Sequence, residues 1–283
     1  MRETGKPAVL RAADPEIGRT VHVGDVATNY HDVGRGPVVL LLHGSGPGVS
    51  AWANWRGVIP ELSQKFRVVA PDIMGFGYTR TPAGSEYGVE SWSRHLTGFC
   101  DALELDRFSV VGNSFGGSMA LRLATEQPRR VEKLVLMGSV GVRFTLTPGL
   151  DRVWGFTPSI ENMRGLLDLF AYDRSRLTDE LATIRLAAAT RPGVQEAFAA
   201  MFPAPRQAGV DSLVVDEEKI ATLGLPTLIM HGRDDQVIPL ATSMRLHELV
   251  SPSQLHVFGE CGHWVQIEQR DRFVALVSQF LAE

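Results

Sequence analysis

Short, mostly apolar runs alternate along this chain with segments of helical spacing. The runs lie at residues 38–42, 66–70, 108–111, 131–137, 226–230 and 254–258. Continuous apolar runs of this length are typical of strands buried on both faces of a parallel sheet. Segments that favour amphipathic helices lie at about 52–64, 88–104, 119–124, 240–250 and 268–281. The alternation predicts an α/β fold with a doubly wound, mostly parallel sheet.

The N-terminal part has a different pattern, with apolar and polar residues in strict alternation. Residues 20–23 and 26–31 alternate in this way, and Gly24-Asp25 stands between them as a hairpin turn signal. The hairpin brings the number of expected strands to eight.

The strand–helix rhythm stops between residues 141 and 208. This segment is helical in pattern, rich in aromatic residues and without a convincing buried strand. Long connections between successive strands are usually functional, so we interpret residues 141–208 as a helical lid inserted after the sixth strand. The alternative is a helical subdomain that packs elsewhere. The core is then expected in two parts, residues 1–140 and 209–283.

Composition and charge exclude several classes of protein. Hydrophobic residues make up 44% of the chain and charged residues 21%, with a net charge of −4 and no basic run. This balance argues against nucleic acid or an anionic membrane as a partner. No apolar stretch is long enough for a membrane span, and the two cysteines form no metal-binding motif. We expect a cytoplasmic protein that needs no metal and no cofactor.

The strongest chemical signal is a G-x-S-x-G sequence at a strand-to-helix junction. Gly112, Ser114 and Gly116 follow the strand at 108–111 and precede the helical segment at 119–124. Such a turn forces the serine into strained geometry and exposes its hydroxyl above the sheet, which suits a nucleophile. The alternative is an ordinary glycine-rich turn.

A serine nucleophile needs a base, and the chain has eight histidines. His263 follows the last expected strand in a loop, where the base is expected when the chain order is Ser, Asp, His. His43 opens a glycine-rich loop and suits local hydrogen bonding, and His231 suits packing.

The acid that orients this base should follow the preceding strand, which leaves Asp234 and Asp235. We favour Asp235, because Gly232 and Pro239 bracket a tight turn that would present it. The oxyanion hole needs two backbone N–H groups. We expect them from Phe115, directly after the nucleophile, and from Ser45 in the loop after the strand at 38–42.

Five stretches of this chain resemble a known family. They are His43 to Trp55, Gly112 to Gly117, Thr190 to Gly193, Gly232 to Asp235 and Gly262 to Trp264. Over nearly its whole length the chain resembles the α/β hydrolases. More narrowly, it resembles the meta-cleavage product hydrolases, which cleave carbon–carbon bonds in the bacterial degradation of aromatic rings.

The resemblance implies a small-molecule substrate, a 2-hydroxy-6-oxo-hexa-2,4-dienoate, and a homo-oligomer. The motifs look like the branch that acts on small C6 substituents, with 2-hydroxymuconic semialdehyde first and small alkyl ketones next. The implied substrate-binding residues are Arg191, Asn54, Asn113, Trp264, Gly44 and Gly46. Arg191 would bind the carboxylate through its forked donors.

Other functions share parts of this signature. A serine carboxylesterase would have the same triad and oxyanion hole, and a cofactor-free haloperoxidase or a non-catalytic binding protein could share the fold. Dehalogenases and epoxide hydrolases of this fold need aspartate at the nucleophile position, where this chain has Ser114. Whether Ser114 attacks the substrate itself or assists water stays open.

Overall fold

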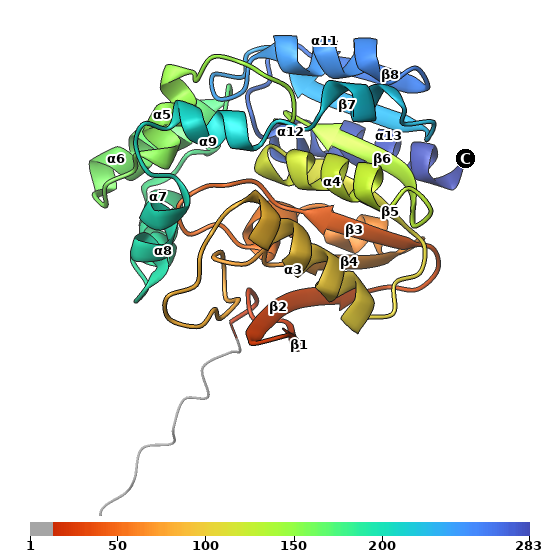
Figure 1. Cartoon of the computed structure of the whole chain (residues 1–283). Helices are drawn as coiled ribbons and strands as arrows, with labels where there is room; N and C mark the ends of the chain where they lie inside the picture. Colours follow the sequence, from red (N-terminus) through yellow and green to blue (C-terminus); the bar gives the residue numbers. More distant parts are fainter. Residues whose placement is uncertain (1–13) are drawn as a thin grey trace, which may run out of the picture.

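A single eight-stranded sheet forms the centre of the protein in the computed structural model, which describes residues 14–283 (Figure 1). The strand order is β1-β2-β4-β3-β5-β6-β7-β8, and only the pairs β1–β2 and β2–β4 are antiparallel. The strands are β1 (Arg19–Val23), β2 (Val26–Val33), β3 (Val38–Leu42), β4 (Arg67–Pro71), β5 (Phe108–Asn113), β6 (Val131–Met137), β7 (Thr227–Gly232) and β8 (Ser253–Phe258). The predicted mostly parallel eight-stranded sheet is confirmed. The start of the expected core, residues 1–13, lies outside the described residues.

Helices cover both faces of this sheet, which explains the continuous apolar runs. One face packs on α3 (Val89–Ala102), α4 (Phe115–Glu126) and α11 (Leu240–Leu249), and the other on α1 (Ala51–Trp55), α2 (Ile59–Leu62) and α13 (Arg270–Ala282). Successive residues of β3 alternate between the two cores: Leu40 and Leu42 join the first, Val39 and Leu41 the second. Because each face of the sheet is buried against helices, the residues that point to either face are apolar.

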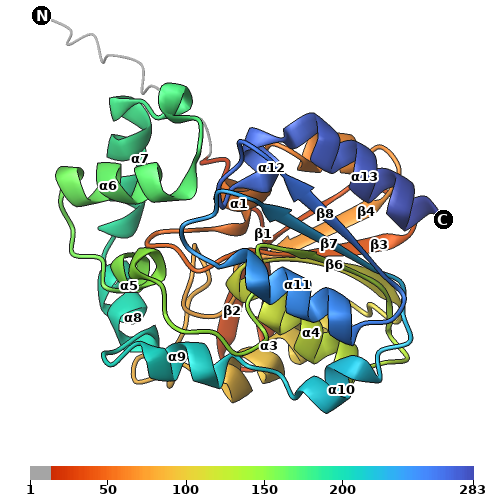
Figure 2. The ribbon, with the colours of Figure 1, turned by 90° about the horizontal axis from the view of Figure 1, so that it is seen from above.

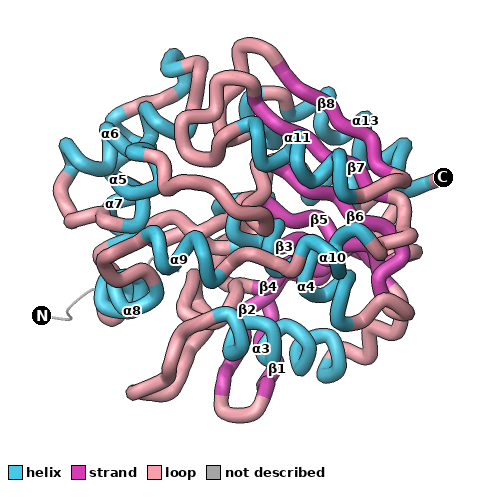
Figure 3. The backbone as a smooth tube through the Cα atoms, turned by 45° about the horizontal axis from the view of Figure 1, so that its top comes forward, coloured by secondary structure: helices cyan, strands magenta, loops and turns pink. Residues whose placement is uncertain are grey.

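Five helices between β6 and β7 form a separate group beside the sheet (Figures 2 and 3). We call them the cap helices: α5 (Pro148–Trp154), α6 (Ile160–Phe170), α7 (Asp179–Ala189), α8 (Val194–Met201) and α9 (Gln207–Ser212). Three of them begin where a side-chain oxygen caps a free backbone N–H: Thr147 for α5, Ser159 for α6 and Thr178 for α7. The expected boundary at residue 208 falls inside α9.

One predicted helix is interrupted. The segment 52–64 forms two short helices, α1 and α2, joined by a turn at 56–58. Pro60 lies in the first turn of α2, where its missing N–H costs nothing; in a continuous helix its ring would clash with the carbonyl of residue 56. The helix therefore ends and restarts. Among the described residues, no helix combines the length and apolar character that a membrane span requires.

Candidate active site

Ser114 occupies the strained turn that its sequence motif predicts. It joins β5 to α4 with φ 54° and ψ −116°, a conformation that non-glycine residues rarely adopt. The flanking glycines are required by close packing: a Cβ on Gly112 would lie 2.5 Å from the carbonyl oxygen of Gly116. A Cβ on Gly116 would lie 2.3 Å from the carbonyl oxygen of Leu42 on β3. The tight junction thus fixes the serine at the carboxyl end of the sheet.

His263 and Asp235 lie together at the same edge. The His263 Nδ1 and Asp235 Oδ2 atoms are 2.7 Å apart, and both side chains are at most 5% exposed. Asp235 Oδ1 accepts hydrogen bonds from the N–H groups of Val237 and Ile238. Burial alone would raise the pKa of Asp235, but His263 and His231 outweigh it and hold that pKa well below its usual range. The carboxylate therefore stays charged and can orient the imidazole.

Asp234 does not share this environment. Its carboxylate lies 3.4 Å from the Arg233 guanidinium near the surface, and its N–H donates to the carbonyl of Cys261. The structure therefore brings Asp235, and not Asp234, to His263.

The other two strand-end histidines make local contacts. His231 is fully buried, with Nδ1 2.7 Å from Ser243 Oγ and Nε2 3.0 Å from the carbonyl of Ile238. His43 Nε2 accepts from the N–H of Ile73, so Nδ1 carries the proton and donates to the carbonyl of Gly44. Burial lowers the pKa of His43 to about 4 and keeps it neutral. Both histidines hold loops in place.

The two expected oxyanion donors are free. In the described part of the chain, neither the N–H of Ser45 nor that of Phe115 has a hydrogen-bond partner. Phe115 is the first residue of α4, where helix N–H groups lack intrahelical acceptors. The Ser45 side chain is held separately, because its Oγ accepts from Trp154 Nε1 of α5 at 2.9 Å. The geometry leaves two amides available for a developing negative charge.

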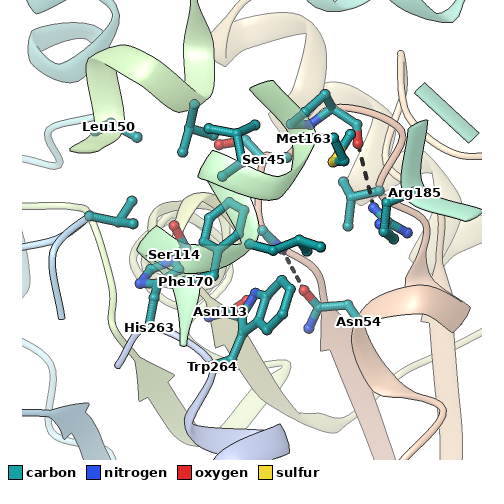
Figure 4. Close-up of a pocket in the computed structure, with 18 residues that line it drawn as sticks. Ser45, Asn54, Asn113, Ser114, Leu150, Met163, Phe170, Arg185, His263 and Trp264 are labelled. Carbon is teal, nitrogen blue, oxygen red and sulfur yellow. Dashed lines mark hydrogen bonds between the residues drawn. The ribbon is translucent and has the colours of Figure 1, made fainter. Parts of the chain in front are cut away.

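A pocket between the sheet and the cap helices brings Ser45, Ser114 and His263 together (Figure 4). Ser114 and His263 line it, with no hydrogen bond between them in the described structure, as is common before substrate binds. Its other polar lining residues are Ser45, Asn54, Asn113 and Arg185. Gly44, Gly46 and Pro47 also line it. The remainder is apolar or aromatic and comes mostly from the cap helices: Val49, Leu150, Val153, Met163, Leu166, Leu167, Phe170, Val237 and Trp264.

Arg191 is not among the residues that line this pocket, which contradicts the expectation for it. Its guanidinium donates to the carbonyls of Gly77 and Ala188 and lies 3.8 Å from the centre of the Tyr78 ring. Arg191 follows the end of α7 and faces a separate surface hollow. Arg191 therefore links the cap helices to the loop that follows β4.

Arg185, which the sequence reasoning missed, lines the pocket instead. It lies on the inward face of α7, between buried Ala182 and Ala189. Burial lowers the pKa of Arg185, yet a guanidinium stays charged. The sequence did contain a signal for this placement. Arg185 lies three residues after Ala182 and four residues before Ala189, so the three residues share one face of a helix.

The part of the chain that forms this site matches a known protein family. The family model described as "alpha/beta hydrolase fold" matches residues 37–269. A 2-hydroxy-6-oxo-2,4-heptadienoate hydrolase of Pseudomonas putida is 62% identical over 94% of this chain and 97% of its own length. A 2-hydroxymuconate semialdehyde hydrolase of Pseudomonas sp. is 55% identical over 95% of each chain. The chain belongs to the meta-cleavage product hydrolases.

Solved structures agree with this membership. A meta-cleavage product hydrolase from Pseudomonas fluorescens, CumD, determined with acetates bound, is 56% identical with a TM-score of 0.94. The match covers 95% of this chain and 99% of that one. The expected family and fold are thus confirmed for this meta-cleavage product hydrolase.

Proposed function

We propose that this protein hydrolyses the C5–C6 bond of 2-hydroxy-6-oxo-hexa-2,4-dienoates that carry hydrogen or methyl on C6. The observation that carries the proposal is the mixed lining of the pocket, which combines the polar Asn54, Asn113 and Arg185 with apolar residues of the cap helices. An anionic dienoate with a small apolar ketone matches both parts of this lining. The names of the two similar Pseudomonas enzymes support the same substrate class.

The carboxylate end of the substrate would bind beside Arg185, in the role first expected of Arg191. The Arg185 guanidinium donates only to the Pro47 carbonyl, at 3.4 Å, and has no carboxylate within ion-pair distance in the described structure. The Asn54 Nδ2 is buried and unpaired among the described residues. Donors left unpaired in a buried site are costly unless a ligand or water satisfies them. Gly44, Gly46, Asn113 and Trp264 complete this end.

The first chemical step would be a proton transfer. A carbanion at C5 is a poor leaving group in the dienol form. Moving the proton from the C2 hydroxyl to C5 gives a keto form whose C2 carbonyl can accept the electron pair of the breaking bond. His263 suits this transfer, since an imidazole can both accept and donate a proton and Asp235 orients it.

The second step would add an oxygen nucleophile to the C6 carbonyl. Either Ser114 attacks and water releases the acyl group, or Ser114 and His263 activate a water directly. The Ser45 and Phe115 amides would bind the resulting oxyanion. The C5–C6 bond then breaks, the electron pair moves to the C2 oxygen, and the products are 2-hydroxypenta-2,4-dienoate and a carboxylic acid.

We infer that the cap helices act as the lid of this site and that the protein works as a cytoplasmic homo-oligomer without a cofactor. The apolar end of the pocket comes largely from α5 and α6, which supports the lid. Cys100 and Cys261 are free and buried, as suits a reducing compartment. Light scattering of the purified protein tests self-association.

The deciding experiment follows the absorbance of dienoates with hydrogen, methyl, isopropyl or phenyl on C6. We expect fast decay for hydrogen and methyl, and a loss of at least about 10³-fold in Ser114→Ala. Ser118→Ala is the matched control, since the Ser118 hydroxyl on α4 donates to the carbonyl of Leu213 and does not line the pocket. Absence of dienoate decay with brisk hydrolysis of p-nitrophenyl esters would identify a carboxylesterase instead.

A further inference from the structure

A second cavity adjoins the active-site pocket on its outer side. It lies between α1, α7 and the segment around α12 (Val265–Glu268), and its volume of about 310 Å³ exceeds the roughly 50 Å³ of the inner pocket. The two share Val49, Asn54, Arg185 and Trp264 as lining residues. These four residues therefore form the wall between them.

The inner pocket has no exposed lining residue, whereas the outer cavity reaches the surface. Every residue lining the inner pocket is buried or partly buried. The outer cavity is lined by Arg56 and by Ile184 and Ile267, whose exposed fractions are 52% and 37%. The outer cavity is therefore the space between this part of the surface and the wall that it shares with the inner pocket.

Polar groups in this wall and beside it lack partners within the described residues. Gln266 is 2% exposed and donates through Nε2 to the carbonyl of Asn54, but its Oε1 is unpaired within residues 14–283. Asn54 Nδ2, in the shared wall, is unpaired as well. A passing polar molecule would find both a donor and an acceptor here.

The outer cavity carries charges of both signs, and two of its guanidinium groups form no ion pair in the described structure. Arg56 has no ion pair in the described structure. Burial lowers the pKa of Arg185 most, the charge of Glu16 raises it, and the charge of Arg56 lowers it, so all three charges lie near one another. Its three carboxylates are Glu16, Asp173 and Glu268; Glu268 accepts from the N–H groups of Gly262 and Tyr172, and Glu16 accepts from the Ser50 hydroxyl. The third cation, Arg270, is paired with Glu61. Arg56 and Arg185 are thus the two cations of this cavity that form no ion pair among the described residues.

We propose that this outer cavity is the entry vestibule of the enzyme, in which Arg56 attracts the dienoate carboxylate and Arg185 receives it at the inner wall. The proposal rests on the proposed function. Arg56 and Arg185 suit the carboxylate, and Ile184 and Ile267 suit the apolar dienone body. A guanidinium without an ion pair at the entrance would attract the carboxylate of an anionic substrate.

A blocking experiment tests the route. Because both native thiols are buried, Ile184→Cys can be labelled selectively, with either a methylthio group or a bulky pyrenyl maleimide. We expect the bulky label to lower kcat/KM for the 6-methyl dienoate by about tenfold or more, while the methylthio label leaves it near that of the unlabelled variant. Met244→Cys with the same bulky label is the control, because Met244 is 51% exposed on α11. An unchanged kcat/KM in bulky-labelled Ile184→Cys would overturn the proposal.

A charge experiment tests the role of Arg56. At low ionic strength, Arg56→Gln should lower kcat/KM by about threefold with kcat unchanged, and the difference should fade in high salt. Arg107→Gln, a charge change before β5, should have no such effect. Equal kcat/KM for Arg56→Gln and the native protein in low salt would contradict steering by Arg56.

The experiments distinguish a failure of the vestibule proposal from a failure of the proposed function. If unlabelled protein does not consume dienoates, the proposed function fails. The comparison of labelled and unlabelled Ile184→Cys is then made with p-nitrophenyl acetate. A loss of ester hydrolysis with the bulky label would still support the entry route, and no loss would reject it.

Discussion

Asp234 and Asp235 are adjacent in sequence but differ in environment. Asp235 contacts His263 and is fully enclosed, whereas Asp234 faces Arg233 near the surface. We predict that Asp235→Asn lowers kcat by about 10³- to 10⁴-fold, because the amide favours the wrong imidazole tautomer. Asp234→Asn should stay within about threefold of the native rate. Steady-state kinetics on the dienoate measures both, and a reversed order would reject Asp235 as the orienting acid.

Arg185 and Arg191 offer a second matched pair. Loss of a charged hydrogen bond to a substrate carboxylate costs about 1.5–3 kcal/mol, or roughly 10- to 150-fold in affinity. We therefore predict that Arg185→Gln lowers kcat/KM by about that factor, mainly through KM.

Arg191→Gln should instead reduce stability, since it removes the bond to the Gly77 carbonyl and the contact with Tyr78. A loss of about 1 kcal/mol in urea unfolding, with kcat/KM little changed, is expected. A large rise in KM for Arg191→Gln alone would restore the original expectation for that residue.

At the scale of elements, the active site depends on how the loop after β3 meets α7. Gly48 has φ +66°, and a Cβ there would lie 2.4 Å from the backbone nitrogen of Ala189. We predict that Gly48→Ala lowers the free energy of unfolding by about 1–3 kcal/mol. It should also raise KM, because the displaced α7 carries Arg185.

The control for this change is Gly224→Ala. A Cβ at Gly224 meets nothing within 4 Å, and its backbone needs no positive φ. Urea unfolding and dienoate kinetics of the two variants should therefore diverge. Equal stability of the two variants would contradict the prediction, because it would show that the loop after β3 and α7 can move apart with no loss of stability.

For the whole molecule, buried ionisable groups set the response to acid. Burial lowers the pKa of His43 and of His95 to about 4, and burial raises that of Asp72 to about 6. As pH falls below 6.5, the unfolded chain binds protons on both histidines and the native protein does not, so stability is lost. Asp72 acts in the opposite direction, since the native protein binds its proton below pH 6 before the unfolded chain does.

Each of these three groups can change the free energy of unfolding by at most about 3 kcal/mol. The two histidines therefore outweigh the one carboxyl group. We predict that urea unfolding shows a net loss of about 2–3 kcal/mol between pH 7 and pH 5. His95→Gln should reduce this loss by about 2 kcal/mol, whereas His22→Gln, on the exposed face of β1, should not. A stability that rises on acidification would contradict the prediction.

The sequence by itself determined the sheet, the position of Ser114 and the choice of His263. These depend on local constraints: apolar runs long enough for buried strands, a glycine-flanked turn, and loops that follow strand ends. Parallel strands bring those loops to one edge whatever the details of packing. The turn after β7 also favoured Asp235 from sequence, because its glycine and proline limit which carboxylate turns inward.

The tertiary structure alone decided which cap residue reaches the pocket. Arg185 and Arg191 lie six positions apart, one within α7 and one just after its end, in a largely apolar stretch without a strand end to fix them. Which one faces Ser114 depends on the rotation of α7 about its axis and on where that helix ends. Contacts distant in sequence set both, namely Gly48 against Ala189 and Arg191 against Gly77. The outer cavity is decided in the same way, because its walls come from α1, α7 and α12, which no local pattern brings together.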